Sequence, residues 1–396
     1  MPRLLAVNLP LLLALAATPA PLATAAPDPA PGAVRVPAAK AAAPVVELAI
    51  LLDTSNSMDG LIDQARAQLW GIVNRVASKT RGGQAPRLRV ALYEYGNSSI
   101  PVEAGYVRLV QPLTGDLDLF SRALFELTTN GGDEYCGEAI GRAVEELEWS
   151  PESVSGSGFR AIYIAGNEPF TQGERPYASA CAAAVGKGVR VNTIHCGPEA
   201  VGAESGWRDG AERAEGDFLN INQDAAVAVA ATPMDARLAD LSREINGTYA
   251  FFGGQRRELE ENQKVQDRNA SRLGRAIAAE RAATKSGPGY RNRADLVDAT
   301  LDAPAPAAAL AAIPAGDLPE EMRAMTDGER LAHVEKLAAE RAALQAEIQE
   351  LSIERDAFLA DLAAGAADGP EAEDTFGSAI LASVDRQMEA AGFEKK

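Results

Sequence analysis

The sequence is poor in basic residues and almost lacks histidine and cysteine. Its 38 Lys and Arg stand against 56 Asp and Glu, a formal charge of −18, so it lacks the basic excess by which proteins bind nucleic acids or anionic membranes. Its 2 His and 3 Cys do not concentrate the soft ligands of a zinc site. No nucleic-acid partner is therefore expected, whereas cations and basic partners are favoured.

Long apolar runs are also missing after the N-terminus. No later stretch reaches the roughly 20 apolar residues of a membrane-spanning helix, so we expect no transmembrane segment in the mature chain. Residues 1–26 have the pattern of a secretory signal, in which Arg3 precedes an apolar stretch over 4–17 and small residues at 23–25 suit cleavage. The Ala/Pro-rich residues 27–44 predict an extended linker. We expect an exported protein, periplasmic or secreted; a buried N-terminal helix is the alternative.

The chain does have enough apolar residues for a large core. At 46% hydrophobic residues global disorder is excluded, and 396 residues suggest about two to three domains. Over residues 45–254, short apolar runs alternate with amphipathic segments. This alternation predicts an α/β fold with a doubly wound, mostly parallel sheet, in which ligands bind at the carboxyl ends of the strands. Strands are predicted at 46–52, 88–95, 107–113, 161–164, 189–194 and 218–221, and helices at 61–76, 117–127, 138–147, 177–185 and 234–245.

Residues 255–396 differ in character and predict a helical, coiled-coil-like C-terminal region. Residues 258–285 are rich in Glu, Arg and Ala, and a short final helix is predicted at 379–391. Over 334–362, positions three or four apart form a seam that is apolar apart from two arginines. The seam either packs on 258–285 or on the sheet domain, or it joins two copies as a homo-oligomer. Its members are Val334, Leu337, Arg341, Leu344, Ile348, Leu351, Arg355, Phe358 and Leu362.

The first predicted strand ends in a polar loop, Asp53-Thr54-Ser55-Asn56-Ser57. One carboxylate and two hydroxyls can converge there on one face of a tight turn. Such a set supplies hard oxygen ligands for a small divalent cation and leaves positions for water and a partner. Ser57 and Asp59 are also good helix caps, so capping is the competing interpretation. The position at the carboxyl end of a buried strand favours a metal site.

This loop, within the residues LLDTSNSM at 51–58, resembles the signature of the von Willebrand factor type A (vWA) domain, over residues 45–253. The resemblance implies a doubly wound α/β domain with a metal-ion-dependent adhesion site (MIDAS). In that site the Asp and the two Ser are joined by a Thr and an Asp from two other loops. Residues 127–137, 164–170 and 192–197 also resemble a group of exported bacterial type A proteins of unassigned function.

The two other loops depart from the family pattern. The second loop normally reads Gly-Gly-Thr. Here the two glycines are followed by two acids, so that either Asp133 or Glu134 stands at the Thr position. The third normally reads Thr-Asp-Gly, but Gly166 stands at the Asp position and is followed by Asn167, which offers a neutral oxygen. Two carboxylates about 4 Å apart repel by about 4 kcal/mol at an effective dielectric near 20, which a cation would relieve. A metal-free site satisfied by backbone N–H groups and Lys or Arg is the alternative.

We therefore predict an exported protein-binding module with a modified adhesion site, and not an enzyme. Mg²⁺ is the expected ion, with Mn²⁺ or Ca²⁺ as alternatives. The expected partner is another protein that supplies a carboxylate or a carbonyl. Loops 167–172 and 197–209 would border the site, with Trp207 either as a contact or as a buried side chain. The expected ligands are Asp53, Ser55, Ser57, Asp133, Glu134 and Asn167.

Other interpretations stay open from the sequence. A metal-free scaffold would self-associate through its C-terminal helices. A hydrolase would use Asp133 and Glu134 as acid and base, although no specific feature supports it. A nucleophilic pair at His195-Cys196 is disfavoured, because adjacent strand residues point to opposite faces. In an oxidising compartment one cysteine pair can bridge, Cys136–Cys196 being the most economical choice and free buried thiols the next, among Cys136, Cys181 and Cys196.

Overall fold

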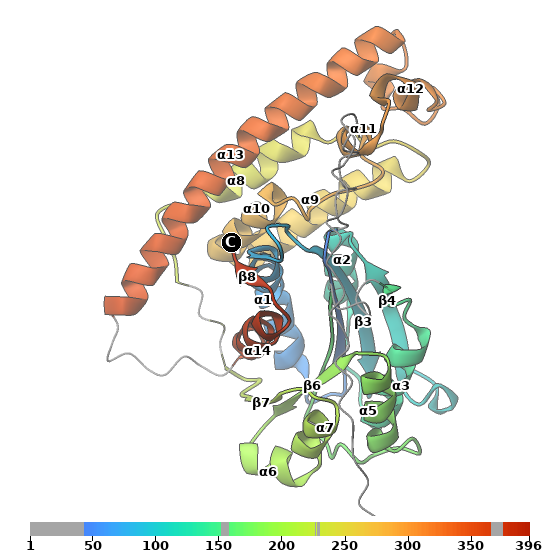
Figure 1. The fold of residues 1–396 in the computed structure, drawn as a ribbon, viewed down its shortest axis with the longest axis vertical. Coiled ribbons are helices and arrows are strands. Elements are labelled where there is room, and N and C mark those ends of the chain that lie inside the picture. The colour runs from blue at the N-terminus through green and yellow to red at the C-terminus, as the bar shows by residue number, and fades with distance from the viewer. Residues whose placement is uncertain (1–42, 152–157, 226, 228–229, 366–374) are drawn as a thin grey trace, which may run out of the picture. The chain divides into compact units, whose positions relative to one another are not determined.

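A twisted six-stranded sheet forms the centre of the N-terminal half in a computed structural model (Figure 1). The structure describes residues 43–151, 158–225, 227, 230–365 and 375–396. The predicted export signal and nearly all of the predicted linker lie outside these residues. All neighbouring strands are parallel except β3 and β4, which confirms the predicted doubly wound, mostly parallel fold. The strand order is β4 (Val107–Thr114), β3 (Arg87–Tyr95), β1 (Val45–Asp53), β5 (Phe159–Gly166), β6 (Arg190–Cys196) and β7 (Phe218–Ile221).

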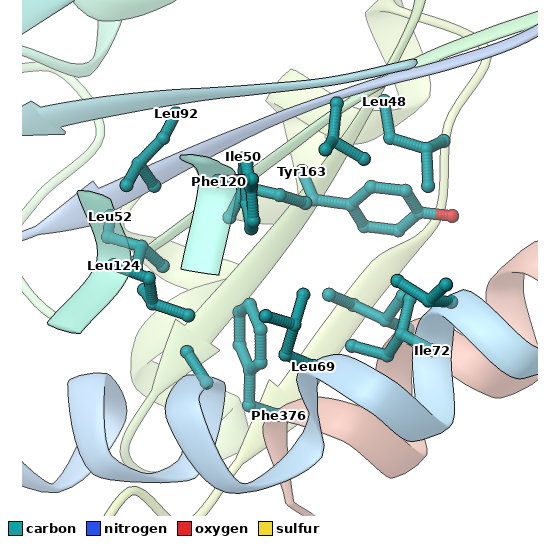
Figure 2. Close-up of a cluster of buried hydrophobic side chains, with 14 of the residues drawn as sticks. Leu48, Ile50, Leu52, Leu69, Ile72, Leu92, Phe120, Leu124, Tyr163 and Phe376 are labelled. Carbon is teal, nitrogen blue, oxygen red and sulfur yellow. The ribbon is translucent and has the colours of Figure 1, made fainter. Parts of the chain in front are cut away.

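The central strand β1 is buried along its whole length, as its continuous apolar run predicts. Its side chains alternate between two hydrophobic clusters, because successive strand residues point to opposite faces. Leu48, Ile50 and Leu52 contribute to the cluster on one face, and Ala49 and Leu51 to the cluster on the other. Figure 2 shows the first cluster, where these side chains point toward a helix that crosses the sheet.

Helices cover both faces of the sheet. The cluster that contains Leu48 is completed by α1 (Asp59–Ala77), α2 (Leu117–Glu126) and α14 (Phe376–Ala390). The opposite cluster is completed by α3 (Cys136–Glu146), α5 (Tyr177–Gly186) and α7 (Trp207–Arg213). The segment 197–209, expected to be a loop, instead contains α6 (Glu199–Glu204) and the start of α7.

The C-terminal region is helical, as predicted, but its helices differ from the predicted ones. The residues 258–285 form two helices, α9 (Arg256–Leu273) and α10 (Arg275–Ser286), because Gly274 between them has a positive φ of 148° that interrupts the helical backbone. Among the described residues, no helix combines the length and apolar character that a membrane span needs. The other described helices of this region include α11 (Leu296–Asp302), α12 (Pro306–Ala311) and α13 (Asp327–Gly365), and α13 packs with α8 (Asp235–Glu244), which matches the helix predicted at 234–245.

The seam predicted along α13 packs on the chain itself over most of its length. It contacts α8, α10, α11 and α12. Its two arginines are buried in ion pairs: Arg341 Nη1 lies 2.8 Å from Asp295 Oδ2, and Arg355 Nε lies 2.9 Å from Asp235 Oδ1. Only the end of the seam is exposed. The intramolecular packing expected from the sequence is thus confirmed as far as Arg355.

The last helix completes the sheet domain. After β7 ends at Ile221, the chain forms the helical region before α14 returns to lie beside α1 (Figure 1). Two short strands that were not predicted, β2 (Lys79–Thr80) and β8 (Glu394–Lys395), pair just beyond these two helices. Residues 43–396 consequently form one compact unit.

Candidate functional site

The polar loop after β1 is held firmly at the carboxyl edge of the sheet. The Thr54 N–H donates to Tyr95 O (2.8 Å), and Thr54 O accepts from the Asn130 N–H (2.9 Å). The Ser55 N–H donates to Asp53 Oδ1 (2.7 Å), which turns the chain sharply. The two hydroxyls of Ser55 and Ser57 lie 3.3 Å apart. A carboxylate and two hydroxyls therefore converge, as the sequence predicts.

These hydroxyls do not cap the following helix. Met58 occupies the N-cap position of α1 without a side-chain hydrogen bond. Asp59, the other predicted cap, instead accepts a hydrogen bond from the Thr129 hydroxyl (2.6 Å). The capping interpretation of the loop is therefore wrong.

Glu134, rather than Asp133, lies beside Asp53. Glu134 is only 4% exposed, whereas Asp133 points to solvent. Gly96, in a left-handed conformation, lies between the two acids: a Cβ there would come within 2.8 Å of both Asp53 Oδ1 and Glu134 Cγ. Only glycine leaves room for both carboxyls at this point. Gln172 positions the second acid by accepting a hydrogen bond from its N–H (3.1 Å).

The two carboxyls are buried, and burial disfavours the ionised form of both. Burial, followed by the charge of Asp53, raises the pKa of Glu134 to about 9. Burial raises the pKa of Asp53 to about 6, against the hydrogen bond from the Ser55 N–H. One oxygen of this carboxyl, Oδ2, is buried without a hydrogen-bond partner. Backbone donors and basic side chains thus do not fully satisfy the site.

The third loop carries Gly166 at the position where the sequence resemblance places an Asp. The Tyr95 hydroxyl donates to Ala165 O (2.8 Å) and fills the space where a Cβ of residue 166 would lie. Gly166 is therefore required by the tyrosine, and an acid cannot stand there without moving it. The next residue, Asn167, donates from Nδ2 to Ser57 Oγ (3.1 Å) and leaves its Oδ1 buried without a partner.

The oxygen atoms around Ser57 fit a hard divalent cation. Carboxylate, hydroxyl and amide oxygens are the ligands of Mg²⁺ and Ca²⁺, and two of these oxygens have no partner in the protein. In the part of the chain that the structure describes, no group of three or more His, Cys, Asp or Glu could hold a metal ion. A cation at this edge would therefore depend on the serines and on Asn167 as well as on the two carboxylates.

No family model and no curated protein matches the chain. Solved structures do match it. The VWA domain of SpRpn10 is 16% identical, with a TM-score of 0.36, and the match covers 46% of this chain and 91% of that one. The protein BatB from Bacteroides thetaiotaomicron is 16% identical, with a TM-score of 0.34, over 58% of this chain and 98% of that one.

A third match is proximal thread matrix protein 1 from the mussel byssus, with a zinc-occupied MIDAS motif. It is 14% identical, with a TM-score of 0.34, and covers 46% of this chain and 43% of that one. The sheet domain is similar in fold to type A domains.

Trp207 and the pair His195-Cys196, which the sequence also singled out, do not form part of the candidate site. Trp207 is fully buried and donates to Glu168 O (2.9 Å), so it supports the third loop from within the fold. His195 packs against this indole ring, whereas Cys196 belongs to the cluster on the opposite face. The expectation that the two cannot form a catalytic pair is confirmed. Asp133 and Glu134, the two acids of the hydrolase interpretation, lie in different environments, since Glu134 is buried and Asp133 is exposed.

Of the two alternatives left open for the cysteines, free buried thiols are confirmed and the Cys136–Cys196 bridge is not formed. All three cysteines are free and buried, and burial raises the pKa of each thiol. Thiols of this kind are packing residues rather than nucleophiles. Two contributors to the candidate site were not predicted, Tyr95 and Gly96, whereas Gln172 belongs to the loop 167–172 that was expected to border it. A glycine directly after the strand that ends at Tyr95 was the one available sequence signal.

Replacement of Glu134 by Gln should change stability and cation binding in opposite directions. The pKa of Glu134 is raised in the folded state, so its stabilising contribution is present below about pH 4.5 and is lost toward pH 9. In EDTA at pH 9, E134Q should be more stable than the parent by roughly 1 kcal/mol or more. Urea unfolding at pH 5 and pH 9 measures this.

With millimolar Mg²⁺ the order should reverse, because the parent gains binding energy and E134Q loses a ligand. Asp133→Asn is the matched control, because it also removes one carboxylate, at the neighbouring position, but from a side chain that is exposed. Equal effects of the two substitutions would contradict a role for Glu134 in the site.

Proposed function

We propose that this chain is an exported protein-binding module that recognises its partner with the help of a divalent cation. The observation that carries the proposal is the buried Asp53 Oδ2, which lacks a partner and lies at the carboxyl edge of the sheet. Asp53, Ser55 and Ser57 would be the primary ligands. Glu134 would complete the negative charge, and Asn167 would offer its free amide oxygen.

Charge is the physical reason for the cation. Two carboxyls that share one buried position cannot both ionise at neutral pH unless a positive charge joins them. A divalent cation supplies that charge and replaces the missing hydrogen bonds by direct coordination. Mg²⁺ is the expected ion, with Mn²⁺ or Ca²⁺ as alternatives.

The surface around the site defines the partner. Asn56, Ser57, Asp133 and Glu168 are exposed around the buried carboxyls, so the rim offers acids and polar groups. A partner that supplies one carboxylate or carbonyl to the cation and basic side chains to the rim would be complementary to it. The predicted signal at 1–26 supports recognition in the periplasm or outside the cell.

Capture of a partner should depend on both the cation and the loop. We expect the full chain, used as bait in an envelope extract, to retain its partner in Mg²⁺ and to lose it in EDTA. Asp53→Ala and the milder Ser57→Ala should reduce retention at least about tenfold, since each removes a ligand. Glu389→Ala should retain it, because Glu389 is exposed on α14 and is not among the rim residues. Calorimetry with Mg²⁺, Mn²⁺ and Ca²⁺ tests ion binding without the partner.

Two results would overturn the proposal. The first is the absence of heat with any of the three ions at millimolar concentration. The second is partner capture that is as strong in EDTA, and as strong with the Asp53→Ala variant, as it is with the parent chain in Mg²⁺. If the same preparations sediment as dimers in a concentration-dependent manner, the metal-free scaffold takes its place. That outcome would agree with the exposed apolar side chains Ile353, Phe358 and Leu362 near the end of α13.

A further inference from the structure

A second site candidate lies in the helical region, away from the sheet edge. A cavity of about 790 Å³ opens between the end of α8 and one side of α9. This volume lies in the range of small-molecule sites. The lining residues are Arg243, Asn246, Gly247, Glu260, Lys264, Asp267, Arg268, Ser271 and Arg272.

Four cations surround this cavity in a chain whose formal charge is −18. Lys264, Arg268 and Arg272 follow one another at four-residue intervals and therefore lie along one face of α9. Arg243 faces them from the last turn of α8. Solubility does not require such a cluster, because the surface is already strongly charged with the opposite sign.

The acid at the floor of the cavity is already neutralised from inside the protein. Asp267 Oδ1 lies 2.5 Å from Arg281 Nε and 2.7 Å from Lys285 Nζ. Although burial opposes its ionisation, these two cations hold the pKa of Asp267 below its ordinary value. Asn246 donates a further hydrogen bond to its Oδ2 (2.6 Å). The floor consequently presents no free negative charge to a ligand.

The rim cations are held only by weak partners. Lys264 pairs with Glu260 (2.6 Å) and Arg268 with Glu261 (2.7 Å), and all four side chains are about half exposed. Arg243 likewise pairs with the exposed Asp240. Exposed pairs of this kind contribute little, so a ligand with several negative groups can displace them. Arg272 makes no ion pair within the described parts of the chain.

We propose that this cavity binds a compact polyanion whose phosphate or carboxylate groups reach Arg268 and Arg272 together. Guanidinium groups bind both kinds of oxyanion through two parallel hydrogen bonds. The lining contains no aromatic side chain on which a nucleobase could stack, which favours a small ligand that carries charge alone. The site does not depend on the cation at the sheet edge.

Calorimetry on the full chain tests the proposal with two probes, inorganic pyrophosphate and citrate. We expect binding of at least one probe, weakened by added salt, and about tenfold weaker in Arg268→Gln and in Arg272→Gln. Arg257→Gln is the matched control, because Arg257 lies on the same helix and is exposed but does not line the cavity. This variant should bind like the parent.

The two probes also distinguish the sources of the anion. Binding of pyrophosphate alone identifies a phosphate ligand, and binding of citrate alone identifies a carboxylate ligand. The proposal is overturned if neither probe binds at millimolar concentration, or if Arg257→Gln weakens binding as much as Arg272→Gln does. Circular dichroism should show all three variants folded, since the replaced side chains are exposed.

Discussion

Removal of residues 375–396 is expected to unfold the sheet domain. The deleted segment buries five large apolar side chains, each at most 2% exposed: Phe376, Ile380, Val384, Met388 and Phe393. At about 1.5–3 kcal/mol for each side chain, their burial contributes about 10 kcal/mol, which is comparable with the whole stability of a typical domain. Circular dichroism and urea unfolding should show no cooperative transition in the truncated chain.

Single substitutions show whether packing is the cause. Phe376 lies beside Leu69 of α1 in the cluster of Figure 2. Its replacement by Ala should cost about 3–5 kcal/mol, whereas Glu389→Ala, at an exposed position of the same helix, should change stability by less than about 0.5 kcal/mol. A truncated chain that unfolds as cooperatively as the parent would contradict the prediction. Truncation after residue 254 also removes α14 and should unfold the sheet domain. Point substitutions are therefore the better way to test separately how the candidate metal site and the helical region contribute to partner binding.

Replacement of Arg281 by Met should be the most damaging single change in the helical region. The guanidinium is fully buried, lies 2.7 Å from Asp118 Oδ1 and 2.5 Å from Asp267 Oδ1, and stacks 4.7 Å from the centre of the Trp70 ring. Arg281 therefore joins α10 to α9 and to the sheet domain. Its loss leaves two buried carboxylates short of a counter-charge, which costs about 3–5 kcal/mol. Urea unfolding at pH 7 measures the loss.

A double substitution separates charge from packing. If the cost arises from the stranded acid, Asp118→Asn should restore part of the stability in R281M while destabilising the parent. Arg257→Met is the control, since Arg257 is exposed on α9 and should tolerate the change. A loss below about 1 kcal/mol in R281M would mean that the surrounding groups, such as the Tyr290 hydroxyl that donates to Asp118 (2.6 Å), suffice alone.

Elements with a strong local pattern could be predicted from the sequence. The positions of β1 and α1 could be predicted directly. A strand buried on both faces leaves a continuous apolar run, whereas a helix buried on one face leaves apolar residues at helical spacing. The Asp53 loop followed from its place at the end of that strand. The seam of α13 could be recognised, but its partner could not, since a helical stripe does not specify which surface covers it.

The remaining features depend on contacts between distant segments. The choice between Asp133 and Glu134 is set by where α3 begins and by the space beside Gly96, and neither is visible in the local pattern. The missing acid at Gly166 is explained only by the Tyr95 hydroxyl of another strand. β2 and β8 contain two residues each and are too short for any period. The packing of α14 on α1 joins segments that nothing in the sequence relates.

The late position of α14 in the chain also sets an order of events during synthesis. All strands of the six-stranded sheet have been synthesised once Ile221 is added, but the helix that covers α1 follows only after residues 222–375. At about 5–20 residues per second, the apolar surface around Leu69 waits roughly 10–30 seconds for its cover. During that interval the unfinished domain presents a hydrophobic face on which chaperones can act and nascent chains can aggregate.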